Sequence, residues 1–376
     1  MAQKTQFVIN DILFLEEFCN LACGYCEGFY PTEFKFKPRD GKLKMPSAWK
    51  AMVEADPLLQ SRLRSEPTVD SLFEVGREVL ARMDENTTYP ILKLSGGEIF
   101  LYDKLVPFVE SIHQRYSGVQ LLTNGVLFGE AEVNQLASLG NVYFQISLDG
   151  VTTQTNVSRS KSEGTLDRIL RNIDRIRDKG MGLEINCVLT NTNTDSFIGL
   201  AEYLAERGDV VVMPRPVRGP PAKTQAATDE QVRAFAAVRD RYSDLGHVLP
   251  PPAYLDRVIS VLERKQRSWD CFVPFFVLGE NYYGKINTCT CSGGLPVLGN
   301  ALDKTTTAFH TLSTRAQYDA GSTPEPCADC ITQYEVFNLY TEGKITDQEL
   351  TKLATFRISN ALAAAQTIKS ELHARK

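Results

Sequence analysis

Three cysteines stand close together near the start of the chain, and thiolates are well suited to bind iron or zinc. They are Cys19, Cys23 and Cys26, with the spacing C-x3-C-x2-C. Thiolates at this spacing can hold one face of a [4Fe-4S] cube and leave one iron open for another ligand. A zinc knuckle or chance clustering is the alternative. Zinc prefers four protein ligands, and no histidine lies near enough in the sequence to complete this set.

A second motif follows the apolar run at residues 91–94. It reads Gly96-Gly97-Glu98 and is preceded by Ser95. A strand that ends in paired glycines can bring bare backbone close to a ligand, where a Cβ would block the approach. The glutamate adds a negatively charged acceptor. Taken alone, Gly-Gly-Glu is also a common turn.

Together the two motifs resemble those of the radical S-adenosylmethionine (SAM) superfamily. The aromatic Tyr25 before the last cysteine and the Cys-Asn-Leu opening add to the resemblance. It implies that the amino and carboxylate groups of SAM chelate the open iron, and that one electron then cleaves the sulfonium to a 5′-deoxyadenosyl radical. It also implies that Gly96, Gly97 and Glu98 bind the amino group of SAM. Ile99 replaces the usual proline and leaves these roles intact.

The elements that must position these motifs alternate along the chain. Short apolar strands that alternate with amphipathic helices predict a parallel sheet covered by helices. We expect an α/β fold, an incomplete (β/α)6 barrel. The predicted strands lie at 118–122, 142–148, 183–189 and 210–214, and the predicted helices at 130–139, 166–177 and 196–207.

Chemistry in such a barrel sits at the carboxyl ends of the strands. Asn124, Ser147 and Asp149 lie at or just after the ends of predicted strands, and the resemblance implies that they lie around the ribose of SAM or the substrate. It likewise implies that Arg159 reaches the SAM carboxylate, and Tyr25 completes the predicted cofactor contacts. Each has a simpler alternative, since Asn-Gly and Asp-Gly are good turn pairs and an arginine can be a solvated loop charge.

A second group of cysteines lies toward the end of the chain: Cys271, Cys289, Cys327 and Cys330. Residues 275–287 predict a β-hairpin whose turn Gly284 permits, and a hairpin would bring Cys271 and Cys289 together across its base. The Cys327–Cys330 pair then completes a closed four-thiolate site. Four cysteines in two pairs also suit a zinc ribbon.

The spacing C-x12-G-x4-C with a later C-x2-C resembles the twitch domain, the shortened form of the SPASM extension. This resemblance implies an auxiliary [4Fe-4S] cluster on the four cysteines. Residues 331–376 contain no cysteine, so we expect one auxiliary cluster, while Cys291 leaves room for an unusual ligand set. The predicted organisation is a partial barrel at 1–225 with an insertion at about 32–86, a helical linker at 226–265, a small α+β twitch domain at 266–335 and a helical segment at 336–376.

Composition limits the function classes. A net charge of −5 leaves no basic footprint for nucleic acid, and no apolar run is long enough to cross a membrane. We expect a cytoplasmic protein with reduced thiols. Cys187, within a predicted strand, is expected to be a buried core thiol. Arg215 and Arg218 follow another strand, where they could reach an anionic substrate or face water.

Two clusters predict two tasks. A flavodoxin or ferredoxin would supply one electron to the first cluster, which would generate the radical. The second cluster would accept an electron from the substrate radical, so that the substrate is oxidised by two electrons in total. The substrate classes implied by the resemblance are ribosomal peptides or peptide-like natural products, which we favour, and small alcohols such as aminocyclitols. Only eighteen residues precede Cys19, so we expect no leader-binding domain at that end. An iron-sulfur or zinc scaffold without enzymatic activity is the alternative from another class.

Overall fold

The computed structural model describes residues 4–14, 18–26, 53–62, 69–208, 210–289, 297–303, 309, 324–357 and 359–374. Cys291 and residues 32–52 and 63–68 of the predicted insertion lie outside them. The insertion's described part includes helices α2 (Pro57–Gln60) and α3 (Val69–Asn86). No helix in the described ranges is long and apolar enough to cross a membrane.

Six parallel strands form the centre of the molecule. In sheet order they are β2 (Ile9–Phe14), β4 (Ile91–Gly96), β5 (Gly118–Thr123), β6 (Val142–Ser147), β7 (Leu183–Leu189) and β8 (Val211–Pro216). Almost every residue in them is buried, as expected for strands that are covered on both faces. The predicted parallel α/β sheet is therefore confirmed, and its strand order is that of an incomplete (β/α)6 barrel. Pro214 and Pro216 fit β8 because it is an edge strand of the described sheet, where missing N–H donors are tolerated.

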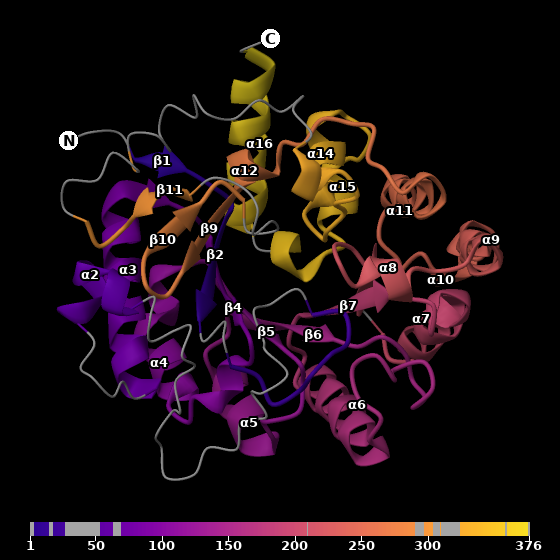
Figure 1. Cartoon of the computed structure of the whole chain (residues 1–376), viewed down its shortest axis with the longest axis horizontal. Helices are drawn as coiled ribbons and strands as arrows, with labels where there is room; N and C mark the ends of the chain where they lie inside the picture. Colours follow the sequence, from indigo (N-terminus) through magenta and orange to yellow (C-terminus); the bar gives the residue numbers. More distant parts are fainter. Residues whose placement is uncertain are drawn as a thin grey trace.

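Helices connect the strands and cover their outer side. They are α4 (Leu105–Ile112), α5 (Glu130–Ser138), α6 (Glu163–Asp178) and α7 (Phe197–Ala205). In Figure 1, α4, α5 and α6 lie on one side of the strands and the C-terminal helices on the other. Helix α6 begins three residues before the predicted start because the Ser162 side chain accepts a hydrogen bond from the Thr165 N–H and caps it.

The predicted hairpin is present and extends the same sheet, but it begins at Val277 and not at residue 275, because a short helix with Pro274 in its first turn runs to Phe276. Strands β9 (Val277–Asn281) and β10 (Lys285–Asn287) are antiparallel, and β11 (Val297–Asn300) pairs with β10. Gly284 has φ of 90°, a conformation that glycine adopts without strain. Strand β9 also runs parallel to β2, in register from Ile9 and Val277 to Leu13 and Asn281. The hairpin predicted for a separate module thus continues the sheet of the barrel, while the domain boundaries themselves stay a prediction.

The remaining helices lie where the sequence predicts helical segments. Residues 226–265 contain α9 (Asp229–Ala236), α10 (Tyr242–Leu245) and α11 (Pro252–Arg264), and α12 (Val273–Phe276) leads into β9. The C-terminal segment forms α14 (Glu335–Thr341), α15 (Asp347–Leu350) and α16 (Ser359–Ala374).

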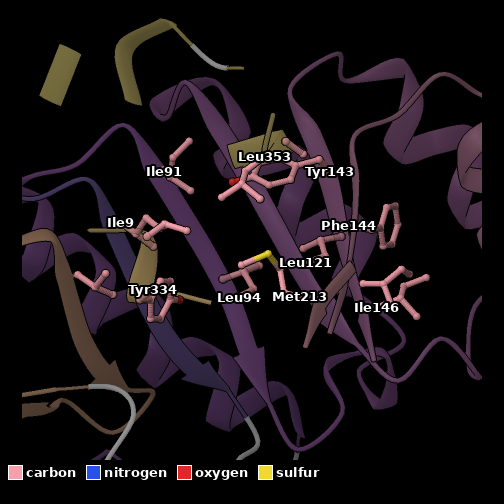
Figure 2. Packing of buried hydrophobic residues seen from close by; sticks show 14 of the residues in the cluster. Ile9, Ile91, Leu94, Leu121, Tyr143, Phe144, Ile146, Met213, Tyr334 and Leu353 are labelled. Carbon is pink, nitrogen blue, oxygen red and sulfur yellow. The ribbon is translucent and has the colours of Figure 1, made fainter. Parts of the chain in front are cut away.

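Part of the C-terminal segment closes the amino-terminal end of the barrel. Figure 2 shows Leu353 beside Tyr143 and Tyr334 beside Ile9. The buried Glu184 carboxylate of β7 accepts hydrogen bonds from the backbone N–H and hydroxyl of Thr355, at 3.0 and 3.1 Å. Since the amino-terminal end is closed in this way, the opposite end of the strands is available for a site.

A buried carboxyl lies on the outer face of the hairpin strand. Asn10 Nδ2 donates to Glu280 Oε1 at 3.0 Å, while Glu280 Oε2 and Asn10 Oδ1 have no hydrogen-bond partner in the described part of the chain. Burial raises the pKa of Glu280 to about 8, with Asn10 opposing the shift and Asp11 adding to it. Glu280 is therefore mainly protonated at neutral pH.

Glu280→Gln should remove a pH-dependent loss of stability. The unfolded carboxyl ionises near its ordinary value of 4.5 and the folded one near about 8, so the folded protein binds the extra proton between these values. The contribution of Glu280 to stability is complete below 4.5 and is lost as the pH rises toward 8. Each unit between the two pKa values corresponds to about 1.4 kcal/mol. Urea unfolding of the wild-type protein and of Glu280→Gln across this pH range measures the two free energies of unfolding. The wild-type value should fall more steeply as the pH rises, and parallel pH profiles would contradict the prediction.

Candidate active site at the carboxyl ends of the strands

The first cysteine segment lies beyond the end of β2, against the loops that follow the other strands. Gly24 N donates to Ser158 O at 2.7 Å, and Gln225 Nε2 donates to Gly24 O at 2.6 Å. A turn joins Cys23 to Cys26, whose N–H donates to the Cys23 carbonyl at 3.1 Å. The segment is thus held by backbone contacts on both sides.

The three thiols are close enough to affect one another's pKa values. Burial raises the pKa of Cys19 to about 12, and the nearby Cys23 and Cys26 add to the shift. Burial likewise raises the pKa of Cys23 to about 11, against the opposing charge of Arg159. In the described ranges, no three His, Cys, Asp or Glu side chains converge as an assembled metal site. The donor set nevertheless fits an iron-sulfur cluster, because three soft thiol donors share one loop and would lose their protons on binding metal.

The close packing of two strands requires a glycine at position 96, which the sequence alone does not reveal. Its φ is +149°, and a Cβ there would lie 1.7 Å from the carbonyl oxygen of Phe14 at the end of β2. Only glycine allows this approach of β4 to the strand that leads into the cysteine segment. The predicted contacts of Gly96 and Gly97 with SAM stay predictions.

Glu98 joins three parts of the site. Its carboxylate accepts hydrogen bonds from Thr123 Oγ1 at 2.8 Å, Asn124 N at 2.8 Å and Phe100 N at 3.0 Å. Its own N–H donates to Phe18 O at 2.8 Å, next to Cys19. Burial raises the pKa of Glu98, and these three donors oppose the shift. Since a carboxylate offers about four acceptor positions, one remains for a further donor such as the predicted amino group.

Glu98→Gln should destabilise the protein even without iron or SAM. An amide has one acceptor oxygen instead of two, so a buried donor on Thr123 or Asn124 loses its partner, at a cost of about 1–3 kcal/mol in the free energy of unfolding. Urea unfolding of the metal-free protein measures this effect, and Glu110→Gln on the exposed face of α4 is the matched control. Equal stability of the two variants would contradict a structural role for Glu98.

Asn124 serves as a turn residue and also contacts the cysteine segment. Its Oδ1 accepts from Val126 N at 3.1 Å. Its Nδ2 donates to Asn20 Oδ1 at 2.7 Å and lies 3.7 Å from Cys19 Sγ. The turn alternative is therefore correct, and it coexists with a position beside the first cysteine.

Asp149, Arg159 and Tyr25 form a buried hydrogen-bonded cluster. Tyr25 Oη donates to Asp149 and accepts from Arg159, and Arg159 Nη2 lies 3.3 Å from Asp149 Oδ1. Arg159 Nη1 also lies 3.9 Å from Cys23 Sγ. Only 7% of Arg159 is exposed, so the alternative of a solvated loop charge is wrong. The cluster fixes the aromatic of the cysteine motif to the loop after β6.

Ser147 ends β6 and is in register with Asn186 of β7, which is in register with Met213 of β8. Because paired residues of neighbouring strands point to the same face, Ser147 and Asn186 share the barrel side of the sheet. Asn186 is 2% exposed, and neither polar atom of its side chain has a partner in the described part of the chain. Sequence analysis missed Asn186. The signal was the polar alternation of Glu184 and Asn186 within an otherwise apolar strand.

Cys187 points away from the barrel and is fully buried, as predicted. Its Sγ contacts the Asp149 carbonyl at 3.8 Å. Arg218, left open between a substrate anion and water, instead donates from Nη1 to Cys330 Sγ at 2.9 Å.

Three of the C-terminal cysteines act electrostatically on one guanidinium group, that of Arg267. Burial opposes the charge of Arg267, but Cys271 and Cys330, together with Glu335 and Cys327, outweigh it and raise the Arg267 pKa. Arg267 N also donates to the carbonyl of Ala328, between Cys327 and Cys330, at 2.6 Å. Cys289 follows β10 and is half-buried. This donor set, with cations beside it, fits a negatively charged thiolate-ligated group.

Comparisons with known proteins identify the family of the chain. The model of the radical SAM superfamily matches residues 15–204. A GTP 3′,8-cyclase of Sulfurovum sp. is 24% identical over 193 residues, 51% of this chain and 49% of that protein. The sporulation killing factor maturation protein SkfB of Bacillus subtilis is 25% identical over 31% of this chain and 28% of its own. The mycofactocin maturase MftC of Mycobacterium tuberculosis is 30% identical over 29% of each chain. The chain thus spans about half the length, or less, of these curated relatives.

Solved structures share the fold at low sequence identity. The structure of anSMEcpe with bound AdoMet aligns with a TM-score of 0.55 at 17% identity, covering 97% of this chain and 99% of that one. SuiB of Streptococcus suis aligns with a TM-score of 0.54 at 15% identity, covering 82% of this chain and 66% of that one. The family match spans just over half of the chain and contains the cysteine triplet, the Gly-Gly-Glu strand end and the Asp149 cluster. The chain therefore belongs to the radical SAM superfamily.

Proposed function

We propose that this protein is a radical SAM oxidoreductase that modifies a peptide or peptide-like natural product. The observation that carries the proposal is the position of the Cys19–Cys23–Cys26 segment. It lies at the carboxyl ends of the parallel strands, hydrogen-bonded or packed against the loops after β4, β5 and β6. Membership of the superfamily implies a [4Fe-4S] cluster and SAM. The non-enzymatic scaffold offers no reason for the buried polar contacts that surround these cysteines.

The residues of the chain take distinct roles in this proposal. Cys19, Cys23 and Cys26 hold the first cluster, and Glu98, with its fourth acceptor position, receives the amino group of SAM together with Gly96 and Gly97. With both cofactors bound and an electron from a flavodoxin or ferredoxin, the site supplies a 5′-deoxyadenosyl radical. SAM and substrate are oriented by residues of the cysteine segment and of the strand ends and loops around it, namely Tyr25, Asn124, Ser147, Asp149 and Arg159.

The second cysteine group completes the oxidation. Cys271, Cys289, Cys327 and Cys330 are proposed to hold an auxiliary [4Fe-4S] cluster in a twitch-type arrangement. Such a cluster would accept the electron that the substrate releases after it has lost one hydrogen atom to the radical and one proton to solvent, and would return that electron to the protein reductant in its oxidised form. The substrate is thereby oxidised by two electrons, as a cross-link or a dehydrogenation. Two buried or half-buried arginines beside the cysteines support a negatively charged group there.

The peptide class is favoured by the relatives. SkfB and MftC are named as maturation proteins, and the solved structures include SuiB with its precursor peptide SuiA and anSMEcpe with peptides. The GTP 3′,8-cyclases, which match over a longer stretch, favour the second candidate, a small molecule such as an aminocyclitol alcohol.

The deciding experiment is anaerobic reduction of the iron-loaded protein with SAM. Formation of 5′-deoxyadenosine is expected for the enzyme and would be absent from a scaffold protein. Mass spectrometry of a candidate peptide encoded beside the gene then tests the substrate class. A mass loss of about two hydrogens in the peptide is the expected result, and an unchanged peptide together with an oxidised alcohol would favour the alternative.

A further inference from the structure

One short segment touches both cysteine sites. We call residues 217–225, which follow β8 and include α8 (Ala222–Gln225), the bridging segment. At its start Val217 shares a small hydrophobic cluster with Val188 and with Tyr25 of the first cysteine motif. At its end Gln225 Nε2 donates to Gly24 O at 2.6 Å. Between these contacts, Arg218 Nη1 donates to Cys330 Sγ of the second site at 2.9 Å. The distance between the sites is therefore set partly by one continuous stretch of backbone.

The second site buries the positive charge of Arg267 beside its cysteines. Arg267 is 4% exposed, and its Nε has no hydrogen-bond partner in the described part of the chain. Burying a guanidinium is costly unless an opposite charge compensates it. Glu335, a carboxylate that also acts on Arg267, is already paired with Arg257. Deprotonated Cys271, Cys327 and Cys330 bound to a cluster would supply the missing negative charge.

A cation beside thiolate ligands affects the two redox states of a cluster unequally. The reduced cluster carries one more negative charge than the oxidised one, so a nearby cation stabilises the reduced form more. Hydrogen bonds to cluster sulfurs and local net charge are among the factors that set the potential of iron-sulfur centres. A guanidinium that donates directly to a ligand sulfur combines both factors.

We propose that Arg218 is a positioning residue of the second site whose guanidinium, through its hydrogen bond to Cys330 Sγ, raises the reduction potential of the auxiliary cluster. This inference rests on the proposed function. The one electron that the substrate radical gives up after losing its proton then has a lower-energy acceptor at the second site, and it returns from there to the oxidised flavodoxin or ferredoxin. The positive charge of Arg267, which acts on Cys327 and Cys330, adds to the effect of Arg218.

The test uses protein that carries only the second cluster. In a background with Cys19, Cys23 and Cys26 replaced by alanine, the midpoint potential is measured by a redox titration followed by EPR. Arg218→Met removes both the charge and the donor, and Arg218→Gln removes the charge but keeps an N–H donor. Lys223→Met is the matched control, since it removes an exposed positive charge from the same segment.

Arg218→Met should lower the potential by at least 59 mV, a tenfold change in the one-electron equilibrium constant. Arg218→Gln should lower it by less, and Lys223→Met should leave it unchanged. Wild-type potentials in both Arg218 variants, at full iron content, would overturn the inference and leave the proposed function standing. If neither variant binds iron, Arg218 acts in cluster assembly and the tuning role is refuted. Zinc in place of iron in the parent protein would overturn the auxiliary cluster and the inference together.

Discussion

Replacement of Cys19, Cys23 and Cys26 together by alanine should abolish the cleavage of SAM. The first cluster has no other protein ligands in the proposed site, so it would not assemble. The iron content of anaerobically reconstituted protein should fall from about eight to about four atoms per chain, the amount held by one remaining [4Fe-4S] cluster. Iron analysis and chromatography of 5′-deoxyadenosine after reduction with SAM measure the two effects.

The control for this prediction is Cys187→Ala. It removes a buried thiol that lies on the outer face of β7, outside both cysteine sites. This variant should keep its iron and cleave SAM. Continued formation of 5′-deoxyadenosine by the triple variant would refute the assignment of the three cysteines. An iron content near four in the wild-type protein, with zinc on the C-terminal cysteines, would instead refute the auxiliary cluster.

Short-range patterns predicted most of the fold. The strands of the parallel sheet are nearly continuous apolar runs bounded by turn residues, so their type followed from local sequence. The hairpin was predictable for the same reason, since Gly284 allows its turn. Its parallel pairing with β2 was not, because more than two hundred and fifty residues separate Ile9 from Val277 and no local pattern records which strand edges meet.

The site was predictable in its residue types but less so in its contacts. The spacing of the first cysteines indicated their chemistry, and Glu98 was identified as an acceptor. That its carboxylate is largely occupied by Thr123, Asn124 and Phe100 depends on three-dimensional packing. The contact of Arg218 with Cys330 joins positions more than one hundred residues apart. Only the structure could choose between a substrate anion, water and a thiol as its partner.

Cys327→Ala should separate the cleavage of SAM from the oxidation of the substrate. If the second cluster takes the electron that the substrate radical releases, its loss leaves the radical without an acceptor. The variant should still form 5′-deoxyadenosine, at a reduced and uncoupled rate, but should form almost no oxidised product. The ratio of product to 5′-deoxyadenosine, measured by mass spectrometry in one reaction, reports this coupling directly.

Folding is the main control for this experiment, because the loss of a metal site can unfold the segment around it. Cys327→Ala leaves the hydrogen bond between Arg218 and Cys330 available, whereas Cys330→Ala removes its acceptor, so the first variant disturbs the bridging segment less. Both must remain folded with about four irons on the first cluster before their products are compared. Under that condition, a wild-type product ratio in Cys327→Ala would mean that the second site is structural. The electron of the substrate radical would then need another acceptor, and the proposed two-electron oxidation through the second cluster would be wrong.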